Sequence, residues 1–567
     1  MNHLSRVLFA LLAASLAWSG GARASTNSPV NSLVEDFVYG SLNLSPVNAT
    51  AAGYHRHHGA SLDDSLDDYG PAGVAARKSF LGMIERRSDA LRAARLDAEQ
   101  RADLDIMRDA IAGYRLEFDE IQGYRHNPTV YVELVGNAIY TPYVLDFAPP
   151  AERFRHIIER LKAVPRLVGQ ARVNLVDSPE VWNRVAREEN AANIELIDAT
   201  LRKDCPPALR ARFDSAAAAA LAALRDFNRW LEGDLAKRTS DWRLGKERYD
   251  KKFRFALAIG KSPDQLLAEA EADLERVRGE MATLAAPKTV EEALAAIAQD
   301  HATPATYIAS AQQALEEATA FVKAKDLLTL PTRGNLQVIE TPAFLRGIYG
   351  VGGFNAAPAL EPRLGAFYWV TPIPTDWPQA RIDSKLREYN RSMMQHLSVH
   401  EAMPGHYVQA EYANDVQPRS RRLLRSLFAN NPYVEGWAVY MQQVMADQGY
   451  HADTPGYQLT LKKQLLRVLA NTILDIRLQT LGMTDEQAIE LMTARTYQEQ
   501  EEARAKLQRA KLSSCQLPTY YAGFNGWLAV RQRYQVRAGA AFQLKRFHED
   551  ALKEGAVPLP VLEKLLN

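Results

Sequence analysis

The chain has 567 residues, of which 47% are apolar and 24% are charged. This is the composition of a globular protein, and it excludes collagen-like, disordered and multi-span membrane proteins. Lysine plus arginine and aspartate plus glutamate both number 68, and without a surplus of positive charge we expect neither nucleic acid nor anionic lipid as a main partner.

The first 24 residues have the pattern of a cleavable export signal. An apolar stretch, 7–18, is followed by Ala22-Arg23-Ala24, the small-x-small pattern that precedes a cleavage site. A membrane-anchoring helix would need about 20 apolar residues, and this run is shorter. We therefore expect residues 1–24 to be a signal peptide cleaved after Ala24, with a periplasmic mature protein and no stable membrane insertion.

The cysteines leave the redox chemistry open. Cys205 and Cys515 are the two cysteines of the chain. They could pair in an oxidising compartment, and they could equally be buried free thiols. Because the chain has no Cys-x-x-Cys motif, thiolate zinc sites and thioredoxin-type redox chemistry are excluded.

Helical periodicity dominates from about residue 72 to 325. Apolar residues recur there at steps of three and four, and several segments open with proline or serine, as helices do. We expect residues 25–326 to form a helical N-terminal lobe. The expected helices cover 75–96, 98–122, 150–161, 179–202, 206–236, 262–284 and 303–323.

The pattern changes between residues 327 and 374. Two short β-branched and aromatic runs, 336–340 and 366–371, are separated by glycines and a proline, which predicts a small sheet. The fold class is therefore mostly α, with a small β-sheet next to the most informative helix, and we expect residues 327–567 to form a catalytic lobe. Helical periodicity returns over 382–411, 432–448, 457–481, 484–507 and 528–553.

The helix after the sheet carries His400-Glu401-Ala-Met-Pro404-Gly405-His406. It resembles the H-E-x-x-H zinc helix, in which two imidazoles bind the metal and the glutamate between them acts on water. In a straight helix, residues six apart lie roughly 120° apart around the axis and could not share an ion. Proline removes a helical hydrogen bond and glycine tolerates unusual backbone angles. We therefore interpret the segment as a zinc helix with a two-residue insertion at which the helix bulges or breaks.

A second pair of histidines competes for the metal. His396 and His400 are four apart and share a face of an undistorted helix. Glu401 would then follow the second histidine instead of standing between two, and Pro-Gly would only end the helix. We favour His400 with His406 and leave His396 outside the set of ligands.

A third ligand is expected from a later helix. A hydrolytic zinc site needs three protein ligands and one open position. Glu435 lies one turn into the helix that begins near Pro432, and a carboxylate from a second helix completes the ligand set of zinc peptidases with two histidines and one glutamate. A solvated helix position is the alternative for Glu435. Next to the two histidines, we favour a ligand.

Both motifs resemble those of the bacterial family called domain of unknown function 885, which is similar to gluzincin metallopeptidases. The motifs are the His-Glu segment described above and Glu435-Gly-Trp-Ala-Val-Tyr440. The resemblance extends over nearly the whole mature chain, from Pro46-x-x-Ala-Thr-x-x-Gly53 to a closing segment at 547–559.

The resemblance implies a gluzincin-like body that holds one zinc ion per chain. His400, His406 and Glu435 would be the zinc ligands and Glu401 the general base. Further family positions fall on Arg509, Gln516, Tyr520 and Gly523. This chain has Ser514-Cys515 where the family has Pro-Gly, and Gln479 where many relatives have a histidine, which leaves the tasks of these two positions open.

Arg509 and Tyr520 are further catalytic candidates. Attack of water on a carbonyl develops negative charge on oxygen, which a guanidinium or a phenol hydroxyl can stabilise at about 3 Å. Aromatic residues in a segment as rich as 520–527 are mostly core residues, which is the alternative for Tyr520.

Together these residues predict an exported zinc-dependent hydrolase, in the first place a peptidase that acts on short peptides through metal-activated water. The strand expected to pair with the substrate backbone is 366–371. Two other classes stay open: a zinc amidase or esterase with the same ligands, and a non-enzymatic periplasmic binding or scaffold protein with a vestigial motif. The oligomeric state follows from nothing in the sequence.

Overall fold

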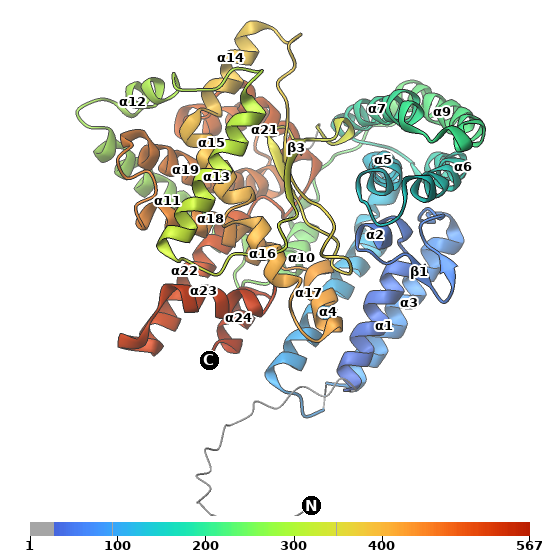
Figure 1. The fold of residues 1–567 in the computed structure, drawn as a ribbon, viewed down its shortest axis with the longest axis horizontal. Coiled ribbons are helices and arrows are strands. Elements are labelled where there is room, and N and C mark those ends of the chain that lie inside the picture. The colour runs from blue at the N-terminus through green and yellow to red at the C-terminus, as the bar shows by residue number, and fades with distance from the viewer. Residues whose placement is uncertain (1–27, 93, 347–348) are drawn as a thin grey trace, which may run out of the picture.

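The computed structural model describes residues 28–92, 94–346 and 349–567 (Figure 1). Over these residues the chain is mostly helical with a small sheet, as the sequence predicts; the sheet has three strands, and a separate short hairpin was not expected. The signal peptide expected over 1–24 lies outside the described residues. Among the described helices, none has the length and apolar character needed to cross a bilayer.

Several helices before the sheet begin at residues that cap them. The Asp97 side chain accepts a hydrogen bond from the Gln100 N–H, and the Ser262 side chain accepts one from the Gln265 N–H. In both cases the glutamine side chain accepts a hydrogen bond from the backbone N–H of the capping residue. The helices are α1 (Pro29–Asn43), α2 (Pro46–Ala51), α3 (Pro71–Ala90), α4 (Ala98–Arg115), α5 (Thr129–Val144), α6 (Pro150–Asn174), α7 (Glu180–Glu195), α8 (Arg202–Asp204), α9 (Arg210–Gly233), α10 (Gly245–Leu257), α11 (Pro263–Ala285), α12 (Val290–Ile297) and α13 (Tyr307–Lys325).

Several of these helices differ from the expectation: α6 is longer than expected, and α1, α2, α10 and α12, like α5, lie outside the expected ranges. The end expected for α6 at residue 161 is wrong, because the helix continues through Pro165, whose neighbours Val164 and Leu167 are buried and hold it in place. Helix α5 was not expected. Its apolar residues lie all around the axis and give no helical period, which is typical of a buried helix.

The helices after the sheet are shorter than expected where a cap or a glycine intervenes. The segment 382–411 forms three helices, because Asn390 caps the second one and Pro404-Gly405 separates the second from the third. The segment 528–553 is divided at Gly539, which has a φ of +52°. The helices are α14 (Gln379–Glu388), α15 (Arg391–Glu401), α16 (His406–Ala413), α17 (Arg419–Leu427), α18 (Asn431–Asp447), α19 (Pro455–Thr480), α20 (Asp485–Glu490), α21 (Gln500–Leu512), α22 (Thr519–Ala538), α23 (Leu544–Lys553) and α24 (Leu559–Leu565).

The sheet contains the two predicted strands and a third. Strands β3 (Leu336–Glu340) and β5 (Ala366–Val370) pair in parallel, and β4 (Gly352–Asn355) pairs antiparallel with the other edge of β5. The expectation that 366–371 pairs with substrate is wrong, because β5 is buried at every position and both its edges are occupied. The edge strand β4, which the sequence pattern did not reveal, pairs with β5 alone among the described strands. The separate hairpin consists of β1 (Arg56–His57) and β2 (Ala60–Ser61).

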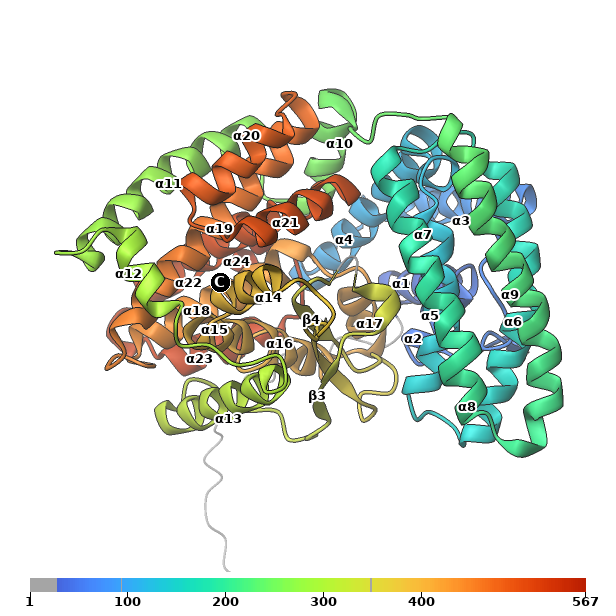
Figure 2. The same cartoon turned by 90° about the horizontal axis from the view of Figure 1, so that it is seen from above.

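Two large hydrophobic clusters form the interior. One lies within the bundle of α5, α6, α7 and α9, which stands at the right of Figure 2. The other joins α1, α3 and α4 to the helices from α10 onward, and it takes helices from both sides of residue 326, since α11 packs on α19 and α13 on α15. The sheet lies between the bundle and α13–α16 (Figure 2).

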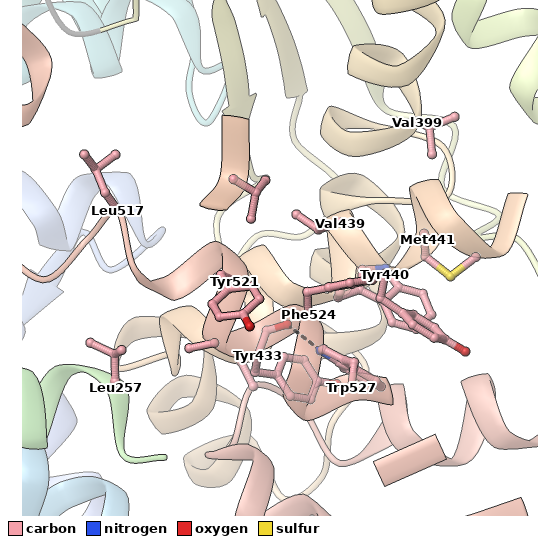
Figure 3. Packing of buried hydrophobic residues seen from close by; sticks show 14 of the residues in the cluster. Leu257, Val399, Tyr433, Val439, Tyr440, Met441, Leu517, Tyr521, Phe524 and Trp527 are labelled. Carbon is pink, nitrogen blue, oxygen red and sulfur yellow. Dashed lines mark hydrogen bonds between the residues drawn. The ribbon is translucent and has the colours of Figure 1, made fainter. Parts of the chain in front are cut away.

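Helices α18 and α22 cross in the larger cluster at very close range. A Cβ on Gly523 would lie 2.7 Å from the Gly436 Cα, so the two backbones touch where both residues are glycine. Aromatic residues surround the crossing, and the Trp527 Nε1 donates a hydrogen bond to the Tyr433 carbonyl oxygen at 2.8 Å (Figure 3). This contact fixes Glu435, at the start of α18, relative to the first turn of α22.

Candidate metal centre

The two histidines lie on separate helices, because the helix that carries His400 ends before His406. Helix α15 stops at Glu401, and α16 starts at His406 after a four-residue turn. Gly405 packs so tightly on the His400 carbonyl that a Cβ there would overlap it. The turn is held from α18 by the Trp437 Nε1, which donates to the Pro404 carbonyl oxygen at 2.9 Å. The break returns His406 to the side of His400, and the two ring centroids are 4.7 Å apart.

His400, His406 and Glu435 bring one ligand atom each to a common point. Their ligand atoms lie within 4.8 Å of one another, and no other such group of three was found among the described residues. The Glu435 Oε2 is 3.5 Å from the His400 Nε2 and 3.3 Å from the His406 Nε2. Ligand atoms at ~2.1 Å from a tetrahedral zinc ion are about 3.4 Å apart. The three residues therefore fit a zinc ion.

The orientation of the Glu435 carboxylate points to the same conclusion. Its Oε1 accepts a hydrogen bond from the Gln516 Nε2 at 3.4 Å, whereas its Oε2 is buried without a hydrogen-bond partner among the described residues. Burial raises the pKa of Glu435, but the facing imidazoles outweigh burial and hold that pKa well below its usual range. A buried, ionised oxygen of this kind calls for a cation.

The outer side of the two imidazoles is less usual. Zinc-binding histidines in most proteins donate their second ring N–H to a carbonyl or a carboxylate. In the described part of this chain, the Nδ1 atoms of His400 and His406 are buried without such a partner. Packing orients the rings instead, because Phe354 stacks on His406 at 6.4 Å and Tyr520 on His400 at 6.1 Å between ring centroids.

The other predicted catalytic residues, Glu401, Tyr520 and Arg509, line a cavity whose wall also includes the three candidate ligands. Glu401 makes no hydrogen bond with any described residue, and burial raises its pKa to about 7, opposed by His400. The Tyr520 hydroxyl accepts a hydrogen bond from the Gln516 Nε2 at 3.2 Å. Burial, reinforced by the charge of Glu435, holds the pKa of Tyr520 well above its usual value, so the phenol keeps its proton. Arg509 also faces this cavity.

The competing histidine is directed elsewhere. His396 is fully buried, stacks on the Tyr457 ring at 4.0 Å and places its Nε2 3.2 Å from the Tyr457 carbonyl oxygen. It is not one of the three residues that bring ligand atoms together. The structure thus groups His400 with His406, as the interrupted-helix interpretation expects.

Two cavities meet at the candidate ligands. The first has a volume of about 600 Å³ and the second of about 280 Å³, and Phe354, His406 and Glu435 line both. The edge strand β4 borders the two cavities, with Gly353 in the second and Asn355 in the first. The volumes are close to those of small-molecule sites, which are about 300–1,000 Å³.

Some residues of this site have no signal in the sequence. Lys506, on the wall of the second cavity, is one charged residue in the strongly charged helix α21, and its spacing alone predicts a solvated surface. Phe354 lies in the unexpected strand β4.

Cys205 and Cys515 are buried in different hydrophobic clusters, and no disulfide joins them.

Comparison with known proteins assigns the chain to a family. It belongs to the family described as bacterial protein of unknown function (DUF885), whose sequence profile matches residues 46–566. This confirms the family resemblance drawn from the motifs; the similarity to gluzincins stays a prediction. No curated protein matches the chain significantly.

Two solved structures are similar over nearly the whole chain. A candidate lipoprotein of unknown function from Shewanella oneidensis is 28% identical, with a TM-score of 0.77 over 94% of this chain and 99% of that one. A candidate lipoprotein from Colwellia psychrerythraea is 18% identical, with a TM-score of 0.74 over 95% and 99%. At that lower identity the likeness concerns the fold alone.

Proposed function

We propose that the protein is a gluzincin-like zinc hydrolase that cleaves short peptides. The observation that carries the proposal is the convergence of His400, His406 and Glu435, in which a buried Glu435 oxygen faces the two imidazoles and has no hydrogen-bond partner among the described residues. Two histidines and one glutamate hold the catalytic zinc of thermolysin and carboxypeptidase A. A zinc ion in this position would act as a Lewis acid toward the substrate carbonyl and would lower the pKa of a water molecule.

The residues around the ligands are suited to proton transfer. Glu401 borders the cavity without a hydrogen-bond partner among the described residues, so its carboxylate can take a proton from the attacking water and return it to the leaving nitrogen. The C–N bond breaks, the water oxygen joins the carbonyl carbon, and the amine leaves with that proton. Because Gln516 donates to the Tyr520 oxygen, the Tyr520 proton is available for the negative charge that develops on the substrate oxygen.

The edge strand favours a peptide over other amides and esters. Among the described strands, β4 is paired on one side only, and its residues border both cavities. Main-chain N–H and C=O groups on a free strand edge can pair with an extended peptide. A substrate in that position would run along Gly353 and Asn355 past the candidate ligands, with one part in each cavity.

Metal analysis of the purified protein tests the metal part of the proposal. We expect about one zinc ion per chain, which is lost in His406→Ala and Glu435→Ala because each removes one of three ligands. His301→Ala is the matched control, since His301 is exposed and is not among the residues that line the two cavities. A wild-type chain that binds no zinc, or variants that bind as much as the control does, would overturn the proposal.

Substitution of the proposed base tests the hydrolytic part. Glu401→Gln keeps the shape of the side chain, and we expect it to retain zinc while peptide hydrolysis falls at least ~100-fold. Unchanged turnover would reject Glu401 as the base. Parallel panels of peptides, simple amides and esters separate a peptidase from the two other hydrolase classes.

We further propose that the protein is exported to the periplasm. The support is the leader pattern of residues 1–24 and the description of both similar structures as candidate lipoproteins. Mass spectrometry of the protein from a bacterial periplasmic extract should give a chain that begins at Ser25. A chain that keeps residues 1–24 and stays in the cytoplasm contradicts this.

A further inference from the structure

The second cavity has a positively charged wall. Lys506 and Arg509 both come from α21 and line the cavity together with His400, Glu401 and Tyr520. Because they are three residues apart on one helix, their side chains lie on the same face. The cavity thus has the candidate metal ligands on one side and two cations on another.

These two cations lack the carboxylate partners that their neighbours have. Arg467, beside them, pairs with Glu502 at 2.5 Å and with Glu388 at 3.5 Å. Within the described residues, neither Lys506 nor Arg509 has a carboxylate oxygen within 4 Å, and Arg509 donates to the Ser513 hydroxyl at 3.0 Å. An unpaired cation at a partly buried site is costly unless it has a functional partner.

The pKa of Lys506 also reflects the surplus of positive charge on this wall. Burial, together with the positive charges of Arg467 and Arg509, lowers its pKa to about 7 against the attraction of Glu502. Glu133 acts electrostatically on Arg509 from beyond ion-pair distance, and burial raises the pKa of Glu133, which weakens it as a counter-ion. An anion in the cavity would supply the missing negative charge.

The first cavity has no comparable charge. Apart from Glu435 and His406, the charged residue on its wall is Arg425, which is paired with Asp103 at 2.8 Å and with Glu99 at 2.5 Å. The remaining lining residues are apolar or uncharged polar. A substrate that spans both cavities therefore meets free positive charge at one end only.

We propose that Lys506 and Arg509 bind the C-terminal carboxylate of the substrate, so that the protein removes a short fragment from the C-terminal end of peptides. This rests on the proposed function, which puts the cleaved bond at the junction of the two cavities. The ligand chemistry is a carboxylate, and an acidic side chain could also supply it. The volume of about 280 Å³ favours a chain end over a continuing chain.

Peptide binding to a hydrolysis-deficient protein tests the inference without turnover. Zinc-loaded Glu401→Gln protein is equilibrated with mixed synthetic tetrapeptides that carry a free C-terminal carboxylate, and separately with the same mixture as C-terminal amides. Each mixture is prepared with and without aspartate and glutamate. We expect the free acids to be retained at least ~10-fold more strongly, because a charge-assisted hydrogen bond contributes about that much.

Substitutions in α21 assign the effect to its residues. Lys506→Met, added to Glu401→Gln, should reduce the preference for free acids to less than ~3-fold, and Lys506→Arg should keep most of it. Lys511→Met is the matched control on the same helix, because Lys511 lies outside the cavity and is paired with Asp485 at 2.7 Å. If Lys506→Met does not fold, the comparison of acids with amides still tests the inference.

The outcomes separate this inference from the proposed function. Equal retention of acids and amides, or retention of neither, overturns the carboxylate site. If amide peptides are retained only when they contain aspartate or glutamate, the carboxylate site stands, but its assignment to the C-terminal carboxylate is overturned. If the wild-type protein cleaves acids and amides alike at internal bonds, the inference fails while the hydrolase stands. If the Glu401→Gln protein prefers acids and the wild-type protein hydrolyses no peptide, the hydrolase is contradicted and the carboxylate site is supported.

Discussion

The crossing of α18 and α22 gives a sharp prediction, because it has no room for a single methyl group. In Gly523→Ala, the new Cβ would overlap the Pro432 carbonyl oxygen and lie 2.7 Å from the Gly436 Cα. Both neighbours are backbone atoms, which cannot rotate away as a side chain does. The two helices must therefore move apart, and Glu435 moves with α18.

The magnitude follows from two opposing terms. Overpacking a well-packed core costs about 1–3 kcal/mol, and contact with two backbone atoms puts this site at the upper end. Replacing glycine by alanine within a helix stabilises the folded state by about 1 kcal/mol, because alanine has the higher helix propensity. We expect Gly523→Ala to lower the free energy of unfolding by about 2 kcal/mol. In Gly279→Ala, on α11, the new Cβ meets nothing within 4 Å, so only the gain of up to about 1 kcal/mol applies.

Urea unfolding of the two variants and the wild-type protein measures this difference, which should be about 3 kcal/mol between the variants. Zinc content gives a second readout, because the moved Glu435 should weaken binding in Gly523→Ala and not in Gly279→Ala. Equal stability of the two variants would refute the close crossing. Full zinc binding by a strongly destabilised Gly523→Ala would refute its role in positioning the ligand.

Three further predictions concern the turn and the N-terminal bundle. Gly405→Ala should abolish zinc binding, because its Cβ overlaps backbone in the turn between the histidines; zinc binding near wild type would contradict this. Trp437→Phe leaves the buried Pro404 carbonyl without its donor, and should cost about 1–3 kcal/mol in urea unfolding; an unchanged midpoint would exclude that bond. Burial and, secondarily, Glu133 raise the pKa of Glu189 to about 9. In the unfolded state this carboxyl ionises at lower pH, so the free energy of unfolding should fall as the pH rises from about 5 to 9. Glu189→Gln should make this total fall smaller by at least about 1 kcal/mol; an equal fall in both proteins would contradict a protonated Glu189.

The sequence determined the class of fold and pointed to the residues of the candidate metal centre. Apolar periodicity located most of the helices, and β-branched runs located strands β3 and β5 to within one residue. The spacing of His400 and His406 around Pro-Gly was enough to infer an interrupted helix, because the geometry of a straight helix excludes a shared ion. These inferences succeeded because each depends on local backbone geometry.

Tertiary structure alone decided which groups meet. The pairing order that buries both edges of β5 and frees an edge of β4 depends on contacts between segments that no period records. The position of Lys506 on a cavity wall depends on packing of α21 against the rest of the core, since its own helix has the pattern of a solvated surface. Glu435 lies opposite the two imidazoles because α18 packs on α15 and α16, with Trp437 of α18 bonded to the turn between them. Local pattern fixes what a segment is, whereas close packing between distant segments fixes what it faces.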